Sequence, residues 1–255
     1  MKQMKFFLVA LMAVVMGMSV TSCMNGDDNT QVNDLPVLGK VKDSFLGLTF
    51  TSLDGFTFKS KNTVEGTTNF MTGDFIVATC SYDTEVDIDY TTNTINATIG
   101  STEKISGNAV YSTTKAEDEG EHPSYVSDRG VISITDLTPA MIDNYNLLVL
   151  IRYFAFEKIA SHTFFMVYYS DENELKGKTD LKLFLRHTST EEKAKETYRA
   201  FSYRVFDIRS AIEAYKNANE GRYPSNITIV SEANSSNNDV PKTTTTTPVT
   251  YTFRE

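Results

Sequence analysis

Residues 180–187 have the sequence Asp180-Leu-Lys-Leu-Phe-Leu-Arg-His187, in which every second residue from 181 to 185 is leucine. Successive side chains of a strand point to opposite faces, so this alternation is typical of a strand with one apolar face. Residues 145–156 and 164–169 are also rich in Leu, Ile, Val, Phe and Tyr, and the connections between the three segments are polar. Together they predict an antiparallel meander.

The pattern continues to the C-terminus. We expect strands over 201–208, 227–230 and 250–253, with a short helix over 210–217. Residues 231–247, which are rich in Ser, Asn and Thr, predict a long loop before the last strand. About seven strands of this kind favour a β-sandwich, which we assign to residues 131–255.

A second group of strands precedes this domain. Asp54-Gly55 separates two apolar segments, 48–53 and 56–59, and is a strong indication of a hairpin. The nearly continuous apolar run 75–82 predicts a buried strand, and the alternating segments 86–90 and 95–99 predict a strand pair. Residues 113–130 lose the alternation and carry a charged cluster, so we expect them to be a connection between two domains or a long exposed loop. The fold class is therefore all-β.

The N-terminus has the pattern of an export signal. Lys2 and Lys5 precede the apolar run 6–20, which at roughly 15 residues is short of the ~20 that a spanning helix needs. The sequence Val20-Thr-Ser-Cys23 resembles the lipobox of bacterial lipoproteins. We therefore expect residues 1–22 to be a cleaved signal peptide and Cys23 to carry the lipid. The alternative is an ordinary secretory signal followed by a chance cysteine.

The segment after Cys23 is polar. Residues 23–36 contain few apolar side chains in their first half, so we expect a flexible tether. Asp27 and Asp28 resemble the sorting signal for surface lipoproteins of the Bacteroides group. The expected location is the cell envelope, in the outer membrane, with surface exposure as a further hypothesis.

Composition excludes one class of partner. Losing Lys2 and Lys5 with the signal leaves 22 basic against 33 acidic residues, so the net charge of -9 becomes -11. A nucleic acid partner is not expected, because phosphate binding needs clustered Lys and Arg. With Cys23 acylated, Cys80 is the one remaining thiol, which excludes an internal disulfide. We expect Cys80 to be a buried structural residue.

Four stretches carry a family resemblance: Asn146-Leu-Leu-Val149, Ser161-His-Thr-Phe164, residues 180–187, and Ser202-Tyr-Arg-Val-Phe-Asp-Ile208. Together they resemble the NigD-like lipoproteins of the Bacteroides group, over most of residues 131–208 and more loosely over 41–105. The resemblance implies a small OB-like barrel, here residues 37–112, followed by an antiparallel β-sandwich. It also implies, as a hypothesis, a role like that of an immunity protein.

Candidate metal ligands are few. His162 and His187 fall in two expected strands that can be neighbours, which makes them weak candidates, and His122 stands apart. No pair has metal-ligand spacing, so we expect no metal and no cofactor. Asp83, Glu85, Asp87 and Asp89 would lie on one face of a strand, too straight a row to surround Ca²⁺, and we expect a solvated face. 

Motifs of nucleophilic and phosphate chemistry are missing: the chain has no Gly-x-Ser-x-Gly elbow and no phosphate-binding glycine loop. We assign no catalytic residue. The sequence favours a lipid-anchored, non-enzymatic binding module of the cell envelope, whose partners are the membrane, through Cys23, and an envelope or secreted protein. The alternative is an envelope hydrolase or glycan-binding protein, for which paired carboxylates can come from anywhere in the chain.

Overall fold

A computed structural model describes residues 30–251, apart from 46, 65–68, 121–123, 157–160 and 174–179. These residues form two compact units that meet in the sequence between Ser106 and Gly107. The predicted signal peptide, Cys23 and residues 24–29 lie outside the described ranges, as does His122. Within those ranges, no helix has the length and apolar character needed to cross a bilayer.

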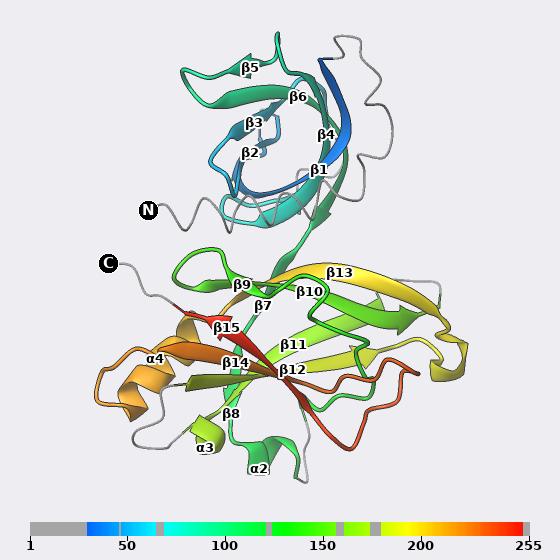
Figure 1. The fold of residues 1–255 in the computed structure, drawn as a ribbon, viewed down its shortest axis with the longest axis vertical. Helices are drawn as coiled ribbons and strands as arrows, with labels where there is room; N and C mark the ends of the chain where they lie inside the picture. The colour runs from blue at the N-terminus through cyan, green and yellow to red at the C-terminus, as the bar shows by residue number, and fades with distance from the viewer. Residues whose placement is uncertain are drawn as a thin grey trace. The chain divides into compact units, whose positions relative to one another are not determined.

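The first unit is a closed barrel (Figure 1). Its strands are β1 (Gln31–Asp43), β2 (Thr49–Ser52), β3 (Thr57–Ser60), β4 (Phe75–Asp83), β5 (Ile88–Asp89) and β6 (Thr94–Lys104). The order is β3-β2-β1-β4-β6, and a parallel pairing of β3 with β6 closes the ring, with β5 attached to β6. Five strands joined in this way have OB-fold connectivity, so the predicted OB-like barrel is confirmed.

Alternate strand positions fill the barrel. Phe50 and Phe58 stack with ring centroids 5.2 Å apart, beside the fully buried Ala78 and Cys80. The Asp54-Gly55 hairpin is confirmed: Gly55 has φ +96° and its N–H donates to the Ser52 carbonyl at 3.0 Å. A positive φ favours glycine, which explains the turn chemistry.

Two sequence predictions for this unit were wrong. The tether was expected to reach residue 36, yet β1 starts at Gln31, because Leu35 packs against the barrel core and pairs with Cys80. The strand expected over 86–90 is reduced to β5. A turn replaces its first part because Asp83 Oδ1 accepts hydrogen bonds from the backbone N–H groups of Glu85 and Val86, at 2.9 and 3.3 Å.

The second unit is a β-sandwich (Figure 1). One sheet has the order β7-β13-β10-β9 and the other β15-β14-β12-β11-β8. The strands are β7 (Ser106–Ala109), β8 (Tyr111–Thr113), β9 (Ala140–Met141), β10 (Asn146–Ala155), β11 (His162–Tyr169), β12 (Asp180–Ser189), β13 (Tyr198–Asp207), β14 (Asn226–Ser231) and β15 (Thr245–Thr250). The helices are α2 (Lys115–Asp118), α3 (Ser170–Asn173) and α4 (Arg209–Ala218), with a 3₁₀ turn at Lys193–Lys195.

The core of the sandwich joins side chains of both sheets. Val149 and Ile151 of β10 share one buried cluster with Leu183 and Leu185 of β12, so the leucine alternation does mark the inner face. The expected helix is confirmed as α4, which buries Ala211, Ile212 and Tyr215 in the same cluster. The five-stranded sheet is mixed, whereas an antiparallel sheet was expected. In it β12 pairs in parallel with β14, and β11 pairs in parallel with β8.

Residues 113–130 are not a connection between domains, as the sequence suggested, but part of the sandwich unit. The buried Asp118 accepts hydrogen bonds from the backbone N–H groups of Ser124 and Tyr125, at 3.0 and 2.7 Å, and from the Tyr169 hydroxyl of β11. The predicted loop over 231–247 also ends early, since β15 begins at Thr245. The first difference depends on the contact of Asp118 with Tyr169, 51 residues away, and the second on the pairing of β15 with β14.

Replacing Gly39 tests the barrel. An alanine Cβ there would overlap the Phe50 ring and lie 2.7 Å from the Thr51 carbonyl oxygen. We expect Gly39→Ala to destabilise this unit by ~1–3 kcal/mol through overpacking. Amide hydrogen exchange in β1 and β2 should speed up, while the exposed control Lys59→Ala leaves it unchanged. Equal exchange in both variants would contradict the packing described here.

Cys80 supplies a chemical test of the same core. Its side chain is fully buried, and burial raises the pKa of the thiol to about 12. In a Cys23→Ala chain, in which Cys80 is the remaining thiol, we expect negligible reaction with a disulfide reagent at pH 8 in the native state. Stoichiometric reaction should follow in urea. Native reaction at the urea rate would show that the barrel opens.

Candidate functional site

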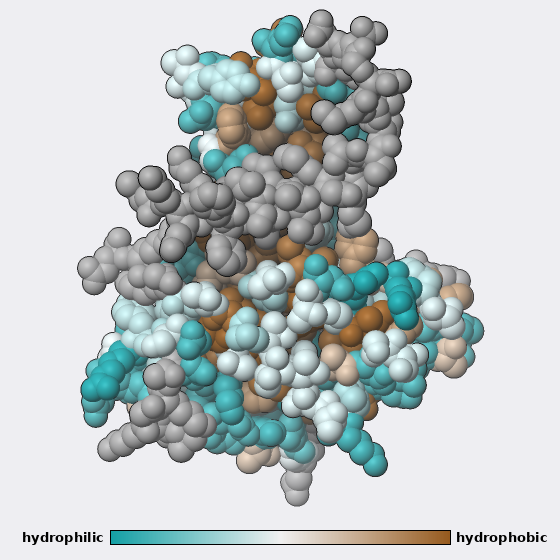
Figure 2. Space-filling model, in the orientation of Figure 1, coloured by the Kyte–Doolittle hydropathy of each residue, from teal (hydrophilic) through white to brown (hydrophobic). Residues whose placement is uncertain are grey.

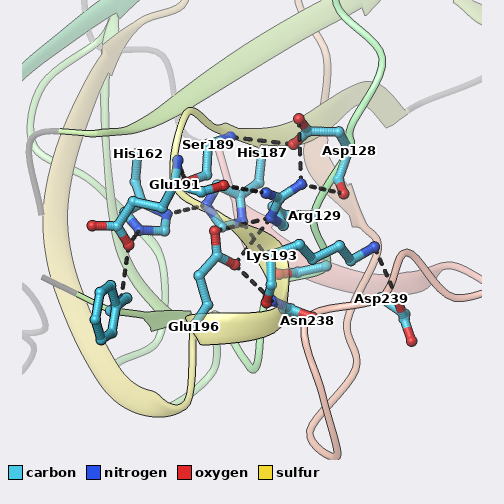
Figure 3. A network of polar contacts seen from close by, with 12 residues as sticks. Asp128, Arg129, His162, His187, Ser189, Glu191, Lys193, Glu196, Asn238 and Asp239 are labelled. Carbon is cyan, nitrogen blue, oxygen red and sulfur yellow. Dashed lines mark hydrogen bonds and ion pairs between the residues drawn. The ribbon is translucent and has the colours of Figure 1, made fainter. Parts of the chain in front are cut away.

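A network of buried polar side chains lies where β11 starts and β12 ends (Figure 3). The antiparallel register pairs His162 with Ser189 and Phe164 with His187. His162 and His187 are therefore diagonal neighbours on the inner face of the sheet. Their Nδ1 and Nε2 atoms, respectively, lie 3.0 Å apart, and the exposed fractions of the two residues are 5% and 1%. The two predicted weak candidates thus meet.

The hydrogen bonds fix which nitrogens carry protons. His187 Nδ1 lies 3.2 Å from the Gly130 carbonyl oxygen, which can only accept, so His187 must donate there. Burial lowers the pKa of His187 to about 3, so the ring is neutral and its Nε2 is an acceptor. His162 consequently donates from Nδ1 to His187. This leaves His162 Nε2 as the outward end of a directed chain of hydrogen bonds.

A carboxylate stands at that end. Glu191 Oε2 lies 3.1 Å from His162 Nε2 and also accepts a hydrogen bond from the Phe156 N–H at 2.8 Å. Two acceptors cannot face each other at this distance in a dry site without a cation between them. Without a metal ion, a proton lies between His162 Nε2 and Glu191 Oε2, whose side chains are 0% and 8% exposed.

A second buried ion pair lies alongside. The Arg129 Nε donates to both oxygens of Glu196, each at 3.0 Å, and the Glu196 side chain has no solvent exposure. Asn238 Nδ2 donates to Glu196 Oε2 at 2.7 Å, and Arg129 donates to the Glu191 carbonyl at 2.9 Å. The Arg129 guanidinium therefore holds both glutamates: it bonds the carboxylate of Glu196 and the backbone carbonyl of Glu191 (Figure 3).

Aromatic rings close the network from the core side. The Tyr153 ring centroid lies 4.7 Å from that of His162 and 5.0 Å from that of Phe164. The Phe164 ring in turn stacks on His187 at 4.5 Å. The rings keep water away from the two imidazoles, which strengthens the electrostatic contacts among the polar groups.

A different polar cluster occupies the outer face of the same sheet. Arg186 precedes His187 in β12 and points the opposite way, where it pairs with Glu232 at 2.6 Å and Glu119 at 3.0 Å. Beside it is an open hollow of about 260 Å³ with Phe184 and Lys182 in its lining. Its other lining residues are Lys115, Glu119, Glu172, Arg186, Val230, Glu232, Thr244 and Thr246. The charged groups in this lining are paired with one another across the hollow.

Sequence reasoning located part of the network. It identified His162 and His187, but not Glu191, Glu196 or Arg129. Glu191 and Glu196 belong to a polar segment with three lysine or glutamate neighbours, which carries no periodic signal. The acidic row at 83–89 does not converge on an ion: Asp83 and Asp89 accept backbone hydrogen bonds of their own turns. Lipid attachment at Cys23 lies outside the described residues.

Arg129→Met tests the buried pair. The substitution leaves the Glu196 carboxylate without its counterion in a dry site, which costs about 3–5 kcal/mol in comparable cases. We expect the free energy of unfolding of the sandwich to fall by this amount. Urea unfolding followed by tyrosine fluorescence measures it, and the midpoint should move to a lower urea concentration. The control Arg222→Met removes an ion pair whose arginine is 78% exposed and should shift it by at most ~0.5 kcal/mol. Equal shifts would refute the assignment.

The fold of this chain is similar to those of several solved structures. No family profile and no curated protein matches the sequence. Among solved structures, a protein named as a lipoprotein from Bacteroides fragilis matches with a TM-score of 0.70 and 22% identity, over 88% of this chain and 100% of its own. A protein of unknown function from Bacteroides vulgatus matches with a TM-score of 0.55 and 9% identity, over 86% and 90%.

A NigD-like immunity protein from Bacteroides caccae is also similar, with a TM-score of 0.48 and 13% identity over 84% of this chain and 91% of its own. At these identities the likenesses concern the fold, and the match to the Bacteroides fragilis protein extends through both units. The structure confirms the barrel and sandwich that the resemblance to NigD-like lipoproteins implied, and this chain shares its fold with the Bacteroides fragilis protein.

Proposed function

We propose that this chain is a lipid-anchored protein of the outer membrane that binds another protein and catalyses no reaction. Its N-terminal sequence has the pattern of a lipoprotein signal, and its fold is that of a protein named as a lipoprotein. The side chains of His162 and Glu191 are 0% and 8% exposed, and this burial supports a role other than catalysis. Anchoring through Cys23 would hold the barrel close to the membrane, because a tether of seven residues spans at most about 25 Å.

The observation that carries the binding role is a pair of exposed apolar side chains at one end of the barrel. Phe45 is 91% exposed and Met71 is 72% exposed. Their two loops are joined, since the Ser44 hydroxyl donates to the Phe70 carbonyl at 2.8 Å and the Thr72 hydroxyl donates to the Lys42 carbonyl at 3.0 Å. We call this feature the Phe45–Met71 rim.

Large apolar side chains held together on a surface favour contact with another protein. Aromatic residues and methionine are enriched at the centre of such contacts, because they bury a large area with little polar cost. Figure 2 shows hydrophobic surface among hydrophilic surface on this unit. The net charge of the chain favours a partner with basic groups around the contact. A secreted toxin would fit an immunity-like role, and an envelope protein would fit a structural one.

In-cell cross-linking followed by affinity purification and mass spectrometry tests the binding role. We expect one protein to be recovered in near-equal amount with the native chain and with the control Lys59→Ser, which changes an exposed barrel residue. Phe45→Ser combined with Met71→Ser should reduce its recovery at least tenfold. A partner recovered equally with the double variant would contradict the rim, and the absence of any partner would contradict the binding role.

The anchor is tested in the same cells. An alkyne-labelled fatty acid should be incorporated into the native chain, which should be recovered in the membrane fraction. The Cys23→Ala variant should carry no label and should be absent from that fraction. Recovery of the partner with the unlipidated chain at the native level would show that binding does not depend on membrane attachment. Unchanged sensitivity to toxins of related strains after gene deletion would contradict the immunity-like form of this proposal.

A further inference from the structure

We propose that His162, Glu191 and Glu196 form a binding site for a divalent transition metal ion, with Zn²⁺ as its simplest occupant. Each residue offers one ligand atom, and the three atoms lie within 4.8 Å of one another. The site belongs to the sandwich unit alone, and it does not depend on the proposed partner binding or on the lipid.

The first two ligands are already at metal-binding separation. With bonds of about 2.0–2.2 Å to one ion, two adjacent ligand atoms lie roughly 3 Å apart. His162 Nε2 and Glu191 Oε2 are 3.1 Å apart. An ion at this place would substitute for the proton that separates the two acceptors in the metal-free protein. The third atom, on Glu196, lies within 4.8 Å of the other two, so it needs a shift of up to roughly 1.5 Å, or one bridging water, to complete the set.

The orientation of His162 is that of a ligand. Metal-binding histidines donate their second ring N–H to a fixed acceptor, which sets the tautomer and turns the free lone pair to the metal. Here that acceptor is His187 Nε2 at 3.0 Å, itself fixed by the Gly130 carbonyl. His187 cannot bind the ion, because both of its nitrogens are engaged. Of the two histidines predicted as weak candidates, one is a ligand and the other positions it.

Hydrogen bonds also fix the positions of the two glutamates. Glu191 is fixed by the Phe156 N–H and by the contact of Arg129 with its carbonyl oxygen. The Glu196 Oε2 accepts from Asn238, and both of its oxygens accept from Arg129. A carboxylate oxygen has about two acceptor directions. Glu191 Oε2 accepts one of these bonds and Glu196 Oε1 accepts one, so a metal bond can take a second direction at each of these two atoms. Arg129 also offsets one of the two negative charges that the dry site would otherwise bring together.

The ligand set selects the ion. One imidazole and two carboxylates suit a first-row transition ion, whereas Ca²⁺ takes six to eight oxygens and Mg²⁺ keeps most of its waters. The burial of the site leaves few places for water ligands, which favours the low coordination number of Zn²⁺. 

Calorimetric titration of the EDTA-treated full chain with ZnCl₂ tests the proposal. We expect one ion per chain, and Glu191→Gln should weaken its binding by at least tenfold. The matched control Glu192→Gln alters the neighbouring glutamate, whose side chain is 64% exposed, and should leave the affinity unchanged. His187→Phe keeps all three ligands but removes the acceptor of His162, and should weaken binding by roughly 10- to 100-fold.

A spectroscopic readout separates this site from surface binding. Co²⁺ in the site should give the visible absorption of a low-coordinate ion, and Zn²⁺ should displace it. Circular dichroism checks that each variant is folded, and the native chain is decisive if a variant is not. The proposal is overturned if the native chain binds no Zn²⁺ at one-to-one stoichiometry, or if folded Glu191→Gln binds it as tightly as the native chain.

Discussion

The buried carboxylate of Glu196 is the constraint around which this end of the sandwich is organised. A carboxylate without solvent must be paired and hydrogen-bonded, or its burial would cost several kcal/mol. Arg129 and Asn238 meet this requirement, one from the segment before β9 and one from the loop before β15. Three segments that are distant in the sequence are thereby brought to one point. Arg129 then has its remaining donors free to hold the backbone of Glu191, which places the second carboxylate beside His162.

The strand β12 carries this organisation to both faces of its sheet. His187 points inward to His162, and Arg186, its neighbour, points outward to Glu119 and Glu232. The backbone of His187 also bonds the segment 113–130. Its N–H donates to the Ser127 hydroxyl, and its carbonyl accepts from the Arg129 N–H. Residues 113–130 are thus fastened to β12 by side chains on one face and by backbone groups on its edge. This is why a segment with no strand pattern belongs to the sandwich.

The sequence predicted those features of the fold that depend on neighbouring residues alone. The Asp54-Gly55 turn needs a positive φ, and the leucines of β12 need an apolar face, so both could be identified from their neighbours alone. Prediction was wrong where a polar side chain competes with the strand, as when Asp83 captures the backbone N–H groups of the next turn. The meeting of His162 with His187 was foreseeable only as adjacency of strands. Glu191 and Glu196 were not predictable, because their role depends on Arg129, more than sixty residues away.

An apolar cluster joins side chains of both sheets of the sandwich, and the buried ion pair of Arg129 and Glu196 adds to it. Replacing such a pair with apolar groups of similar size often leaves stability unchanged or raises it. What charged groups add is position: directed donors fix the rotamer and tautomer of each partner, which packing alone does not do. In this unit the result is an imidazole nitrogen 3.1 Å from one carboxylate oxygen, with a second carboxylate nearby. An apolar end could also close the sandwich, but it would offer no set of ligand atoms for a cation.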